Sequence, residues 1–379
     1  MTTALIIGGG IAGAVTAIAL HKAGIGATVY EAYATPADEI GAFLTVGTNG
    51  IDALQAVDLD RSVAAAGVPA RWLQVFDAAG EQVGQAPITG SERPDLGPRT
   101  FKRAALYRVL QDELAARDLP VQRGKRLVDG TATTAGVTAT FADGSSAGAD
   151  VLIGADGVHS VTRQLIDPAA PEPRYTGQHI VYGFTDKTPV EVPADTYQMI
   201  RGEKGFFGIT GAPAGGLWWF ARVSGPELTS AQAAAVTTAQ WRDQLIAVFE
   251  ADRTPAAAVV AATTEPIVGT GNYDVPTVPT WHNGRMTIAG DAAHAASPAA
   301  AQGASMAIED AVVLAKCLRD IADPATAFDT YERHRRERVE RLVQASAAMS
   351  QRRTQERPDQ RSSNANWLRD HHIDWDSRI

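Results

Sequence analysis

The amino-terminal segment Ala4–Leu20, ALIIGGGIAGAVTAIAL, is the part of the sequence that says most about the fold. Its first four residues form an apolar run that stops at three glycines, and an alanine-rich helical segment follows. A second apolar run, Ala27–Glu31, comes soon after it. A short strand, a glycine turn, a helix and a second strand in this order predict a parallel β-sheet with helices packed against it.

The glycines of the turn have the spacing Gly8-x-Gly10-x-x-Gly13. The first glycine permits a tight turn, the second lets the backbone approach a pyrophosphate, and the third lets the helix pack on the sheet. The start of the helix then presents unpaired N–H groups and a partial positive charge to the phosphates. We therefore assign phosphate binding to Gly8, Gly10, Ile11, Ala12 and Gly13.

Glu31 ends the second strand, 23 residues after Gly8. Its carboxylate can accept hydrogen bonds from both ribose hydroxyls of a dinucleotide. The whole unit therefore predicts a dinucleotide ligand, but it leaves open whether that ligand is FAD or NAD.

Composition restricts the remaining possibilities. The chain has 379 residues, 45% of them hydrophobic and 20% charged, which is ordinary for a globular protein. The formal net charge of −9 argues against a nucleic-acid partner, and the single cysteine, Cys317, excludes an intrachain disulfide. No histidine pattern indicates a metal site. The apolar start is too short to span a bilayer, so we expect a cytoplasmic protein without a membrane partner.

The pattern of residue types changes between about Gly177 and Thr270, where aromatic and β-branched runs alternate with glycine and proline. This pattern favours an antiparallel sheet, interrupted by one helix over Ala231–Glu250. The fold class we predict is α/β, a Rossmann-type domain with an inserted, mostly antiparallel substrate domain and a C-terminal helix. The expected boundaries are 1–70, 98–176 and 276–345 for the first domain, 71–97 and 177–275 for the second, and 346–379 for a polar tail.

Several smaller expectations concern the rest of the chain. Val137–Phe141 and Val151–Ile153 read as the two strands of a hairpin around Asp143-Gly144. Helices are expected over Gly303–Leu318 and Phe328–Ser350. The polar segment Gln351–Ile379 is expected to be loosely held, with the adjacent pair His371 and His372 solvated.

Two further motifs follow apolar runs. One is Gly154–Arg163, GADGVHSVTR, and the other lies in Arg285–Leu318, RMTIAGDAAHAASPAAAQGASMAIEDAVVLAKCL. With the glycine turn, these motifs resemble, in order, those of the flavin-dependent aromatic hydroxylases of the para-hydroxybenzoate hydroxylase fold. These enzymes are single-component (group A) monooxygenases, and the resemblance spans about residues 4–345.

The resemblance implies FAD as the cofactor and suggests which residues hold it. Some relatives anchor the flavin covalently through Cys or His, but Cys317 lies late on a helix, so we expect noncovalent FAD. In the family, the aspartate matching Asp291 holds the ribityl chain, although a helix N-cap is an alternative role. The helix that begins at Gly303 and Ala304, after Pro298, would face the flavin ring with its N–H groups. The other implied cofactor contacts are Arg103 with phosphate or ribityl oxygens, Val128 with adenine, and Asp156 with the pyrophosphate region. Arg103 has a solvated helix-start arginine as its alternative.

This chain departs from the family pattern at two positions. Ala301 replaces a glycine of the family's PxxGQG loop, so a positive φ there would cost energy. Ala32 follows Glu31 where an arginine is usual, which removes one expected contact with adenosine.

The inserted sheet is expected to cover the substrate. Strand alternation places Trp218 and Phe220 on one face and Trp219 on the other. By resemblance to tetracycline-inactivating members, the first face would meet the substrate, with Met199 and Phe206 on adjoining strands. The alternative is that all four are core residues. No pair of Tyr or His side chains indicates an acid–base couple, so no catalytic residue is assigned.

The resemblance implies an NAD(P)H- and O2-dependent monooxygenase that hydroxylates an aromatic or polyketide-like molecule through a flavin C4a-hydroperoxide. The lack of an acid–base couple suggests a substrate that already carries an activating hydroxyl or amine. Two alternatives remain open, namely a flavin reductase or dehydrogenase of the same fold, and a flavin-loaded protein that sequesters a drug. A monomer and a homodimer are both compatible with the sequence.

Overall fold

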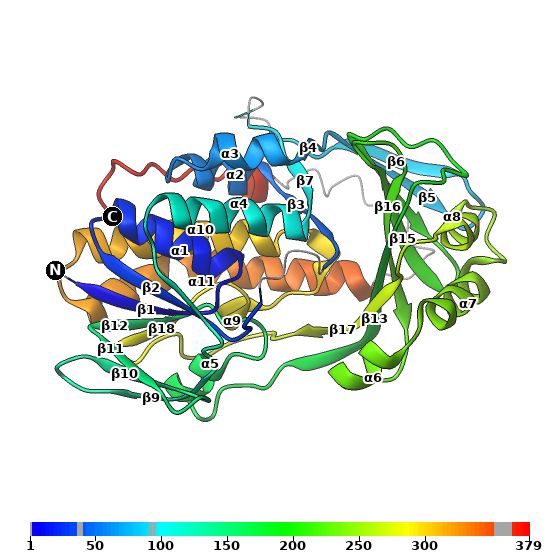
Figure 1. The fold of residues 1–379 in the computed structure, drawn as a ribbon. Coiled ribbons are helices and arrows are strands. Elements are labelled where there is room, and N and C mark those ends of the chain that lie inside the picture. Colours follow the sequence, from blue (N-terminus) through cyan, green and yellow to red (C-terminus); the bar gives the residue numbers. More distant parts are fainter. Residues whose placement is uncertain (1, 36–40, 91–92, 94–95, 352–365) are drawn as a thin grey trace.

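The computed structural model describes residues 2–35, 41–90, 93, 96–351 and 366–379. Figure 1 shows two halves side by side, one built from a parallel sheet and several long helices, the other from one large sheet. Both termini lie at the end of the molecule away from the large sheet.

The predicted parallel sheet is present and has five strands, with β1 at its centre and β12 and β2 paired to its two sides. Each of these neighbours runs parallel to β1, as the glycine-turn unit requires. In sheet order the strands are β18 (Met286–Ile288), β12 (Val151–Gly154), β1 (Thr3–Ile7), β2 (Gly26–Glu31) and β8 (Val121–Arg123).

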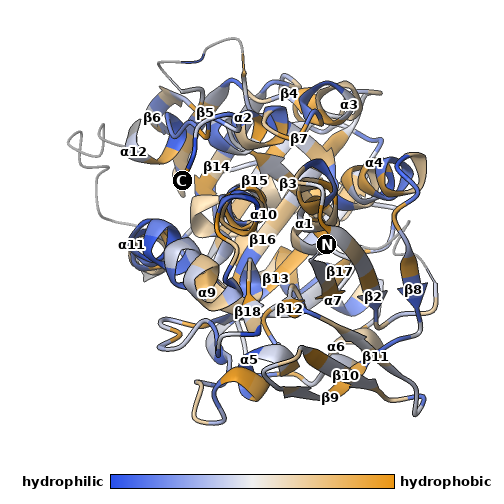
Figure 2. Cartoon of the chain, turned by 90° about the vertical axis from the view of Figure 1, so that its left-hand side faces the viewer, coloured by the Kyte–Doolittle hydropathy of each residue, from blue (hydrophilic) through white to orange (hydrophobic). Residues whose placement is uncertain are grey.

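Helix α10 (Gly303–Asp320) is the central helix of this half. It packs against α1 (Ile11–Lys22), α2 (Thr48–Gln55) and α11 (Pro324–Gln351), which surround it in Figure 2. Every residue from Ser305 to Leu318 is buried, including four charged or polar ones. A helix buried on all sides cannot show the simple amphipathic pattern of a surface helix.

The expected hairpin differs from the one observed. Strand β10 (Val137–Phe141) pairs with β9 (Leu127–Ala132) and β11 (Ser146–Ala149), and Gly144 makes the turn with φ 82°. The residues expected as the second hairpin strand, Val151–Ile153, instead form the buried strand β12 of the parallel sheet. A continuous apolar run suits a strand that is covered on both faces.

The second half contains a seven-stranded sheet that is antiparallel except for the β14–β5 pair, as the fold prediction requires. Strands from 72–87 and from 174–274 meet in it. In order they are β17 (Val268–Asp274), β13 (Arg174–Thr185), β16 (Leu217–Ser224), β15 (Gly205–Gly211), β14 (Thr196–Arg201), β5 (Trp72–Asp77) and β6 (Gln82–Pro87).

The single helix expected over Ala231–Glu250 is wrong. The segment forms two helices, α6 (Ser230–Ala235) and α7 (Thr238–Phe249), followed by α8 (Ala256–Ala262). Thr237 separates the first two, because its hydroxyl accepts from the Gln240 amide and the Gln240 side chain accepts in return, as in a capping box. Helices α7 and α8 cover the outer face of the large sheet (Figure 1).

The remaining elements connect the halves or cover the parallel sheet. A small sheet of β3, β7 and β4 lies where the halves meet. The bounds are β3 (Phe43–Val46), β4 (Val68–Pro69), β7 (Arg99–Lys102), α3 (Asp60–Ala66), α4 (Arg103–Ala116), α5 (Val161–Ile166), α9 (Asp291–His294), the 3-10 turn η1 (Pro298–Ala300) and α12 (Asn366–Arg369).

The prediction of a loosely held tail is also wrong for residues 366–379, because these residues pack on the half that contains the parallel sheet. Ile373 is buried and its amide donates to Asp52, while His372 Nδ1 lies 2.9 Å from the same carboxylate. Burial lowers the pKa of His371 to about 4, so neither histidine is simply solvated. Residues 352–365 lie outside the described part of the chain.

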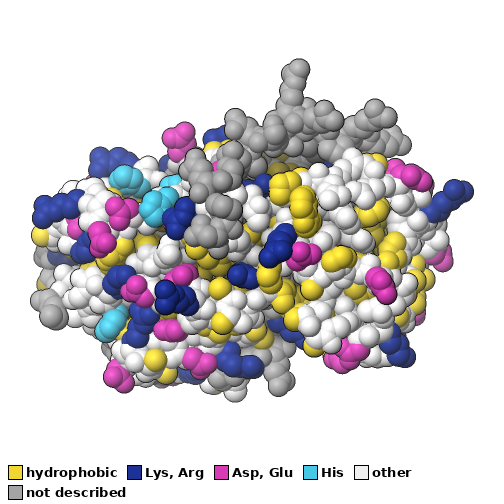
Figure 3. All heavy atoms as spheres, turned by 90° about the horizontal axis from the view of Figure 1, so that it is seen from above, with side chains coloured by type: hydrophobic (Ala, Val, Ile, Leu, Met, Phe, Trp, Pro, Cys, Tyr) yellow, Lys and Arg dark blue, Asp and Glu magenta, His cyan; other side chains and the backbone are white. Residues whose placement is uncertain are grey.

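The surface carries charges of both signs. Figure 3 shows acidic and basic side chains intermixed over the half that contains the parallel sheet. Among the described residues, no helix is long and apolar enough to cross a membrane.

Candidate functional site

The three sequence motifs meet at the carboxyl ends of β1, β12 and β18. The three strands end side by side, because the Ala155 amide donates to Ile7 O at 2.8 Å and the Ala289 amide donates to Gly154 O at 2.9 Å. Ligands of open α/β sheets bind at this edge. The motifs that lie far apart in the sequence therefore form one site.

The glycine turn has the geometry that its spacing predicts. Gly8 has φ +104°, and a Cβ there would overlap the carbonyl oxygen of Ala155. A Cβ at Gly13 would overlap the Gly8 carbonyl, whereas a Cβ at Gly10 would meet nothing within 4 Å. The first turn of α1, with Ile11 and Ala12, therefore opens on free space, and a phosphate can approach its backbone.

Glu31 lies beside this turn at the end of β2. Its Oε2 accepts from the Gly9 amide at 2.7 Å, and its Oε1 accepts from the Tyr33 amide at 2.9 Å. These bonds fix the carboxylate, and each oxygen keeps a second acceptor position. The geometry fits the predicted ribose contact, which stays a prediction.

Asp291 is the first residue of α9, with Gly290 as the N-cap at φ 62°. Its side chain is exposed and caps no helix amide, so the alternative role as N-cap is wrong. Its Oδ1 lies 3.9 Å from the position that a Gly303 Cβ would take. A carboxylate with no hydrogen-bond partner among the described residues therefore lies next to the start of α10, where Gly303 and Ala304 present their amides.

Asp156, in contrast, is occupied within its own loop. Its Oδ1 accepts from Ser160 Oγ at 2.5 Å, and its Oδ2 accepts from the amide and hydroxyl of Thr162 at 3.0 Å. Burial raises the pKa of this carboxyl. Buried Arg163 ties the same loop to α9 by donating to Ala292 O at 3.0 Å. The Asp156 carboxylate thus shapes the loop, and its predicted role toward pyrophosphate remains a prediction.

The loop before α10 has the strain expected from its missing glycine. Ala301 has φ 51° and ψ 38°, the left-handed region that costs a residue with a Cβ about 1–2 kcal/mol. Helix α11 holds the loop, since Ser346 Oγ donates to Ser297 O and accepts from the Ala300 amide. Pro298 is exposed at the start of this loop.

Arg103 and Val128 lie at the margins of the site. Arg103 is the exposed first residue of α4, and its aliphatic part packs by Gly41 close to Tyr182. Val128 lies on β9 with half of its surface exposed. Their assigned cofactor contacts remain predictions.

Sequence reasoning missed a buried ion network behind the site. Arg335 of α11 donates to Glu309 at 2.5 Å and to Asp310 at 2.7 Å, and all three side chains are essentially inaccessible. Arg338 adds two bonds to Glu309, and Asp310 accepts from the Gly290 amide at 2.9 Å. The network therefore fixes the Gly290-Asp291 turn from behind. Two adjacent acids within the apolar run 306–315 were the available signal.

The charges of this network compensate one another. Burial alone would raise the pKa of the Glu309 carboxyl, but Arg335 and Arg338 outweigh it and lower the pKa to about 2. For Asp310, too, the effect of burial is outweighed, here by His294 and Arg335, so its pKa falls below the usual range.

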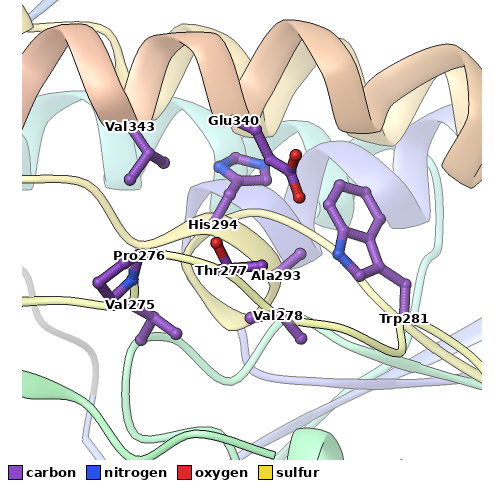
Figure 4. A pocket seen from close by; sticks show the side chains of 9 residues that line it. All are labelled: Val275, Pro276, Thr277, Val278, Trp281, Ala293, His294, Glu340 and Val343. Atoms are coloured by element: carbon purple, nitrogen blue, oxygen red, sulfur yellow. The ribbon is translucent and has the colours of Figure 1, made fainter.

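A small cavity lies between α9, α11 and the segment 275–281 (Figure 4). Its volume of about 10 Å³ is near that of one water molecule, so it is not a ligand site. His294 Nδ1 and Trp281 Nε1, both of which belong to its lining, lack hydrogen-bond partners among the described residues.

The alternation predicted for β16 is present. Trp219 is fully buried on the outer face, stacked on Phe207 at 5.4 Å and donating to Thr263 Oγ1 at 2.9 Å. Trp218 and Phe220 point to the inner face, where each ring lies 5.9 Å from that of Phe43 on β3.

These inner side chains belong to a connected set that we call the aromatic wall. Neighbouring rings in it are 5.9–6.2 Å apart, and Met199 lies in the same row as Phe220 through Gly208. The Tyr197 hydroxyl is hydrogen-bonded to the hydroxyls of Thr45 and Thr100, and burial raises the pKa of Tyr197 to about 12. The wall consists of Phe43, Phe184, Tyr197, Phe206, Trp218 and Phe220.

Two cations flank the wall. Lys102 Nζ lies 4.3 Å from the Phe184 ring centre and is exposed, whereas Arg222 lies 4.2 Å from the Phe206 ring centre and is buried. Sequence reasoning missed Arg222, although it shares the parity of Trp218 and Phe220 along β16. A lone arginine at an inward position of an aromatic strand was the signal.

Comparison with known proteins identifies relatives over nearly the whole chain. A family model described as "FAD binding domain" matches residues 1–346. The aurachin C monooxygenase/isomerase of Stigmatella aurantiaca is 30% identical over 352 residues, 92% of this chain and 89% of the relative. An FAD-dependent urate hydroxylase of Klebsiella pneumoniae is 32% identical over 351 residues, 90% of this chain and 87% of the relative.

Solved structures agree with the sequence comparison. The crystal structure of Klebsiella pneumoniae HpxO complexed with FAD and uric acid superposes with a TM-score of 0.83 at 30% identity. The match covers 98% of this chain and 93% of that one.

Proposed function

The chain belongs to the FAD-dependent monooxygenases of the para-hydroxybenzoate hydroxylase type, and we propose that it hydroxylates a small aromatic or polyketide-like molecule at the aromatic wall. As a member it is an oxidoreductase that binds FAD and uses NAD(P)H and O2. The aromatic wall is the observation that carries the proposed substrate class.

The site residues fit FAD. The open space at Gly10 leaves room for a pyrophosphate, and the unpartnered Asp291 carboxylate can accept from ribityl hydroxyls. In this proposal Glu31 holds the ribose, Arg103 and the first turn of α1 hold phosphate, and Val128 contacts adenine. The amides of Gly303 and Ala304 face the flavin ring. FAD supplies the redox and oxygen chemistry once NAD(P)H has reduced it.

We propose that FAD is bound without a covalent link. Cys317, the only cysteine, is buried in α10, and burial raises its pKa to about 12, so its reactive thiolate form is scarce. Acid precipitation should therefore release the flavin into the supernatant. Flavin that stays with the protein pellet would contradict this part of the proposal.

The aromatic wall would exclude water from the reacting ring, with Trp218 and Phe220 in its centre and Met199 and Phe206 beside them. Each belongs to the inner face, which meets β3 and the small sheet at the junction of the halves. No acid–base couple is assigned to the chain, so the substrate is expected to carry its own activating hydroxyl or amine.

Oxygen incorporation separates this proposal from its alternatives. The holoenzyme is mixed with NAD(P)H, ¹⁸O2 and a panel of aromatic compounds, and both NAD(P)H oxidation and product mass are followed. We expect a compound that stimulates oxidation and gains one ¹⁸O atom. Stimulated oxidation without incorporation would favour the reductase or dehydrogenase, and binding without oxidation would favour the sequestering protein. We further propose that the enzyme is cytoplasmic, because NAD(P)H is supplied there. We also propose that it acts as a monomer or homodimer.

A further inference from the structure

Arg222 on β16 is a buried charge on the inner face of the large sheet. Only 8% of its surface is exposed. Burial lowers the pKa of its guanidinium to about 10, so the group still carries its positive charge at neutral pH. A charge removed from water in this way is costly unless an opposite charge compensates it.

The described residues provide no such compensation. Arg222 Nη1 donates to Ser350 Oγ at 3.2 Å, and the guanidinium lies on the Phe206 ring. Its Nε is buried without a hydrogen-bond partner. In the part of the chain that the structure describes, no carboxylate lies near enough to affect its pKa. Both neighbours are neutral, so donor capacity and charge remain available.

The position of Arg222 links it to both parts of the site. Ser350 Oγ lies 2.6 Å from Ser297 Oγ, which precedes Pro298 in the loop before α10. On the other side, the Phe206 ring that Arg222 covers lies 6.1 Å from Phe220. The guanidinium is therefore placed at the end of the aromatic wall and beside the loop assigned to the flavin.

We propose that Arg222 binds a carboxylate on the aromatic substrate, with the ring of that substrate lying on the aromatic wall. This inference rests on the proposed function and specifies its substrate class as an aromatic acid. A planar guanidinium matches a carboxylate in geometry, and the bond is stronger where water is excluded. Lys102, at the opposite end of the wall, is exposed and therefore hydrated, so it offers a weaker site.

The test compares benzoate with benzamide, which have the same shape and differ in charge. Dissociation constants are measured with the FAD-loaded protein from the change in flavin absorbance. We expect the wild type to bind benzoate at least about tenfold more tightly than benzamide, the ratio that one charge-assisted hydrogen bond supplies. Arg222→Met should reduce this ratio to about one, and Arg222→Lys should retain part of it.

Two control variants localise the effect. Arg242 lies on α7 on the outer face and donates to Thr263 O at 2.8 Å, so Arg242→Met should leave the ratio unchanged. Lys102→Met should change it less than Arg222→Met does. Loss of the preference in either control, with retention in Arg222→Met, would overturn the proposal.

The wild-type comparison needs no variant, so a folding defect cannot hide a negative result. Equal affinity for the two probes, or no saturable response to benzoate, would overturn the inference. Benzoate preference without any ¹⁸O incorporation across the panel would leave the Arg222 site standing and contradict the proposed function. Hydroxylation of neutral and acidic compounds alike, unaffected by Arg222→Met, would support the proposed function and overturn the Arg222 site.

Discussion

Two buried arginines, Arg335 and Arg222, differ in what faces them. Arg335 lies between α10 and α11 and contacts the carboxylates of Glu309 and Asp310. Arg222 lies on the inner face of the large sheet and contacts one hydroxyl and one ring. The first arginine is fully used by the fold, whereas the second has charge and donors that the described fold does not use.

The same difference separates the two aspartates of the cofactor motifs. The carboxylate of Asp156 is occupied by Ser160 and Thr162 in its own loop. The carboxylate of Asp291 has no partner in the described structure and lies beside the start of α10. Polar groups that are saturated by neighbours support the fold, and polar groups left free at a shared edge are available for ligands.

The largest effect is expected for Arg335→Met. The change leaves Asp310 and Glu309 buried with fewer counter-charges, so the free energy of unfolding should fall by about 3–5 kcal/mol. Urea unfolding of the FAD-loaded protein measures it. Arg117→Met is the control, because Arg117 forms a single pair with Glu113 at 3.4 Å near the surface and should cost at most about 0.5 kcal/mol. Similar losses in both variants would show that the network has no special role.

Trp219→Ala and Trp218→Ala compare the two faces of β16. Trp219 is fully buried against Phe207, so its truncation should cost about 3–5 kcal/mol of unfolding free energy. Trp218→Ala should cost less stability but admit water to the reacting ring, so that more NAD(P)H oxidation ends as hydrogen peroxide. The melting temperature and the peroxide-to-product ratio measure these effects, and the reverse pattern would place the substrate on the outer face.

Asp291→Ala tests the free carboxylate. Loss of an acceptor for the ribityl chain should weaken FAD binding by about 1–3 kcal/mol while apoprotein stability changes little, since Asp291 caps no helix. Asp156→Ala should instead lower apoprotein stability more than FAD affinity, because it removes the hydrogen bonds that order the start of α5. Flavin fluorescence titration and apoprotein melting measure both. Full FAD occupancy of Asp291→Ala after extensive dialysis would contradict its assignment.

The smallest effect concerns Ala301, whose φ of 51° is strained. Ala301→Gly relieves that strain but adds freedom to the unfolded chain, so we expect a net gain of up to about 1 kcal/mol. Thermal melting of the apoprotein detects it. A loss of stability would mean that the Ala301 methyl makes contacts that outweigh the strain.

Local patterns in the sequence were sufficient to predict the parallel sheet, the position of α10 and the opposite orientations of Trp218 and Trp219. Each depends on spacing along one segment, as in the glycine turn or the period of a strand. The left-handed backbone at Ala301 was also predictable, because the family's glycine marks it.

Features that depend on partners far apart in the sequence were not predicted. Asp310 meets Arg335 only when α10 packs against α11, and Asp52 binds Ile373 across the fold. The break at Thr237 is an exception, because it depends on a local capping box between Thr237 and Gln240. It was missed because the sequence on both sides favours a helix. The isolation of Arg222 is likewise a property of the packed halves.

The contrast between the two arginines is tested most directly by the melting temperature of FAD-loaded Arg222→Met with and without benzoate. Without benzoate, the variant should melt at or above the wild-type temperature, because an uncompensated buried charge has been removed. Benzoate should then raise the melting temperature of the wild type and leave that of the variant unchanged. A variant that melts well below the wild type, or that benzoate stabilises equally, would show that Arg222 serves the fold as Arg335 does.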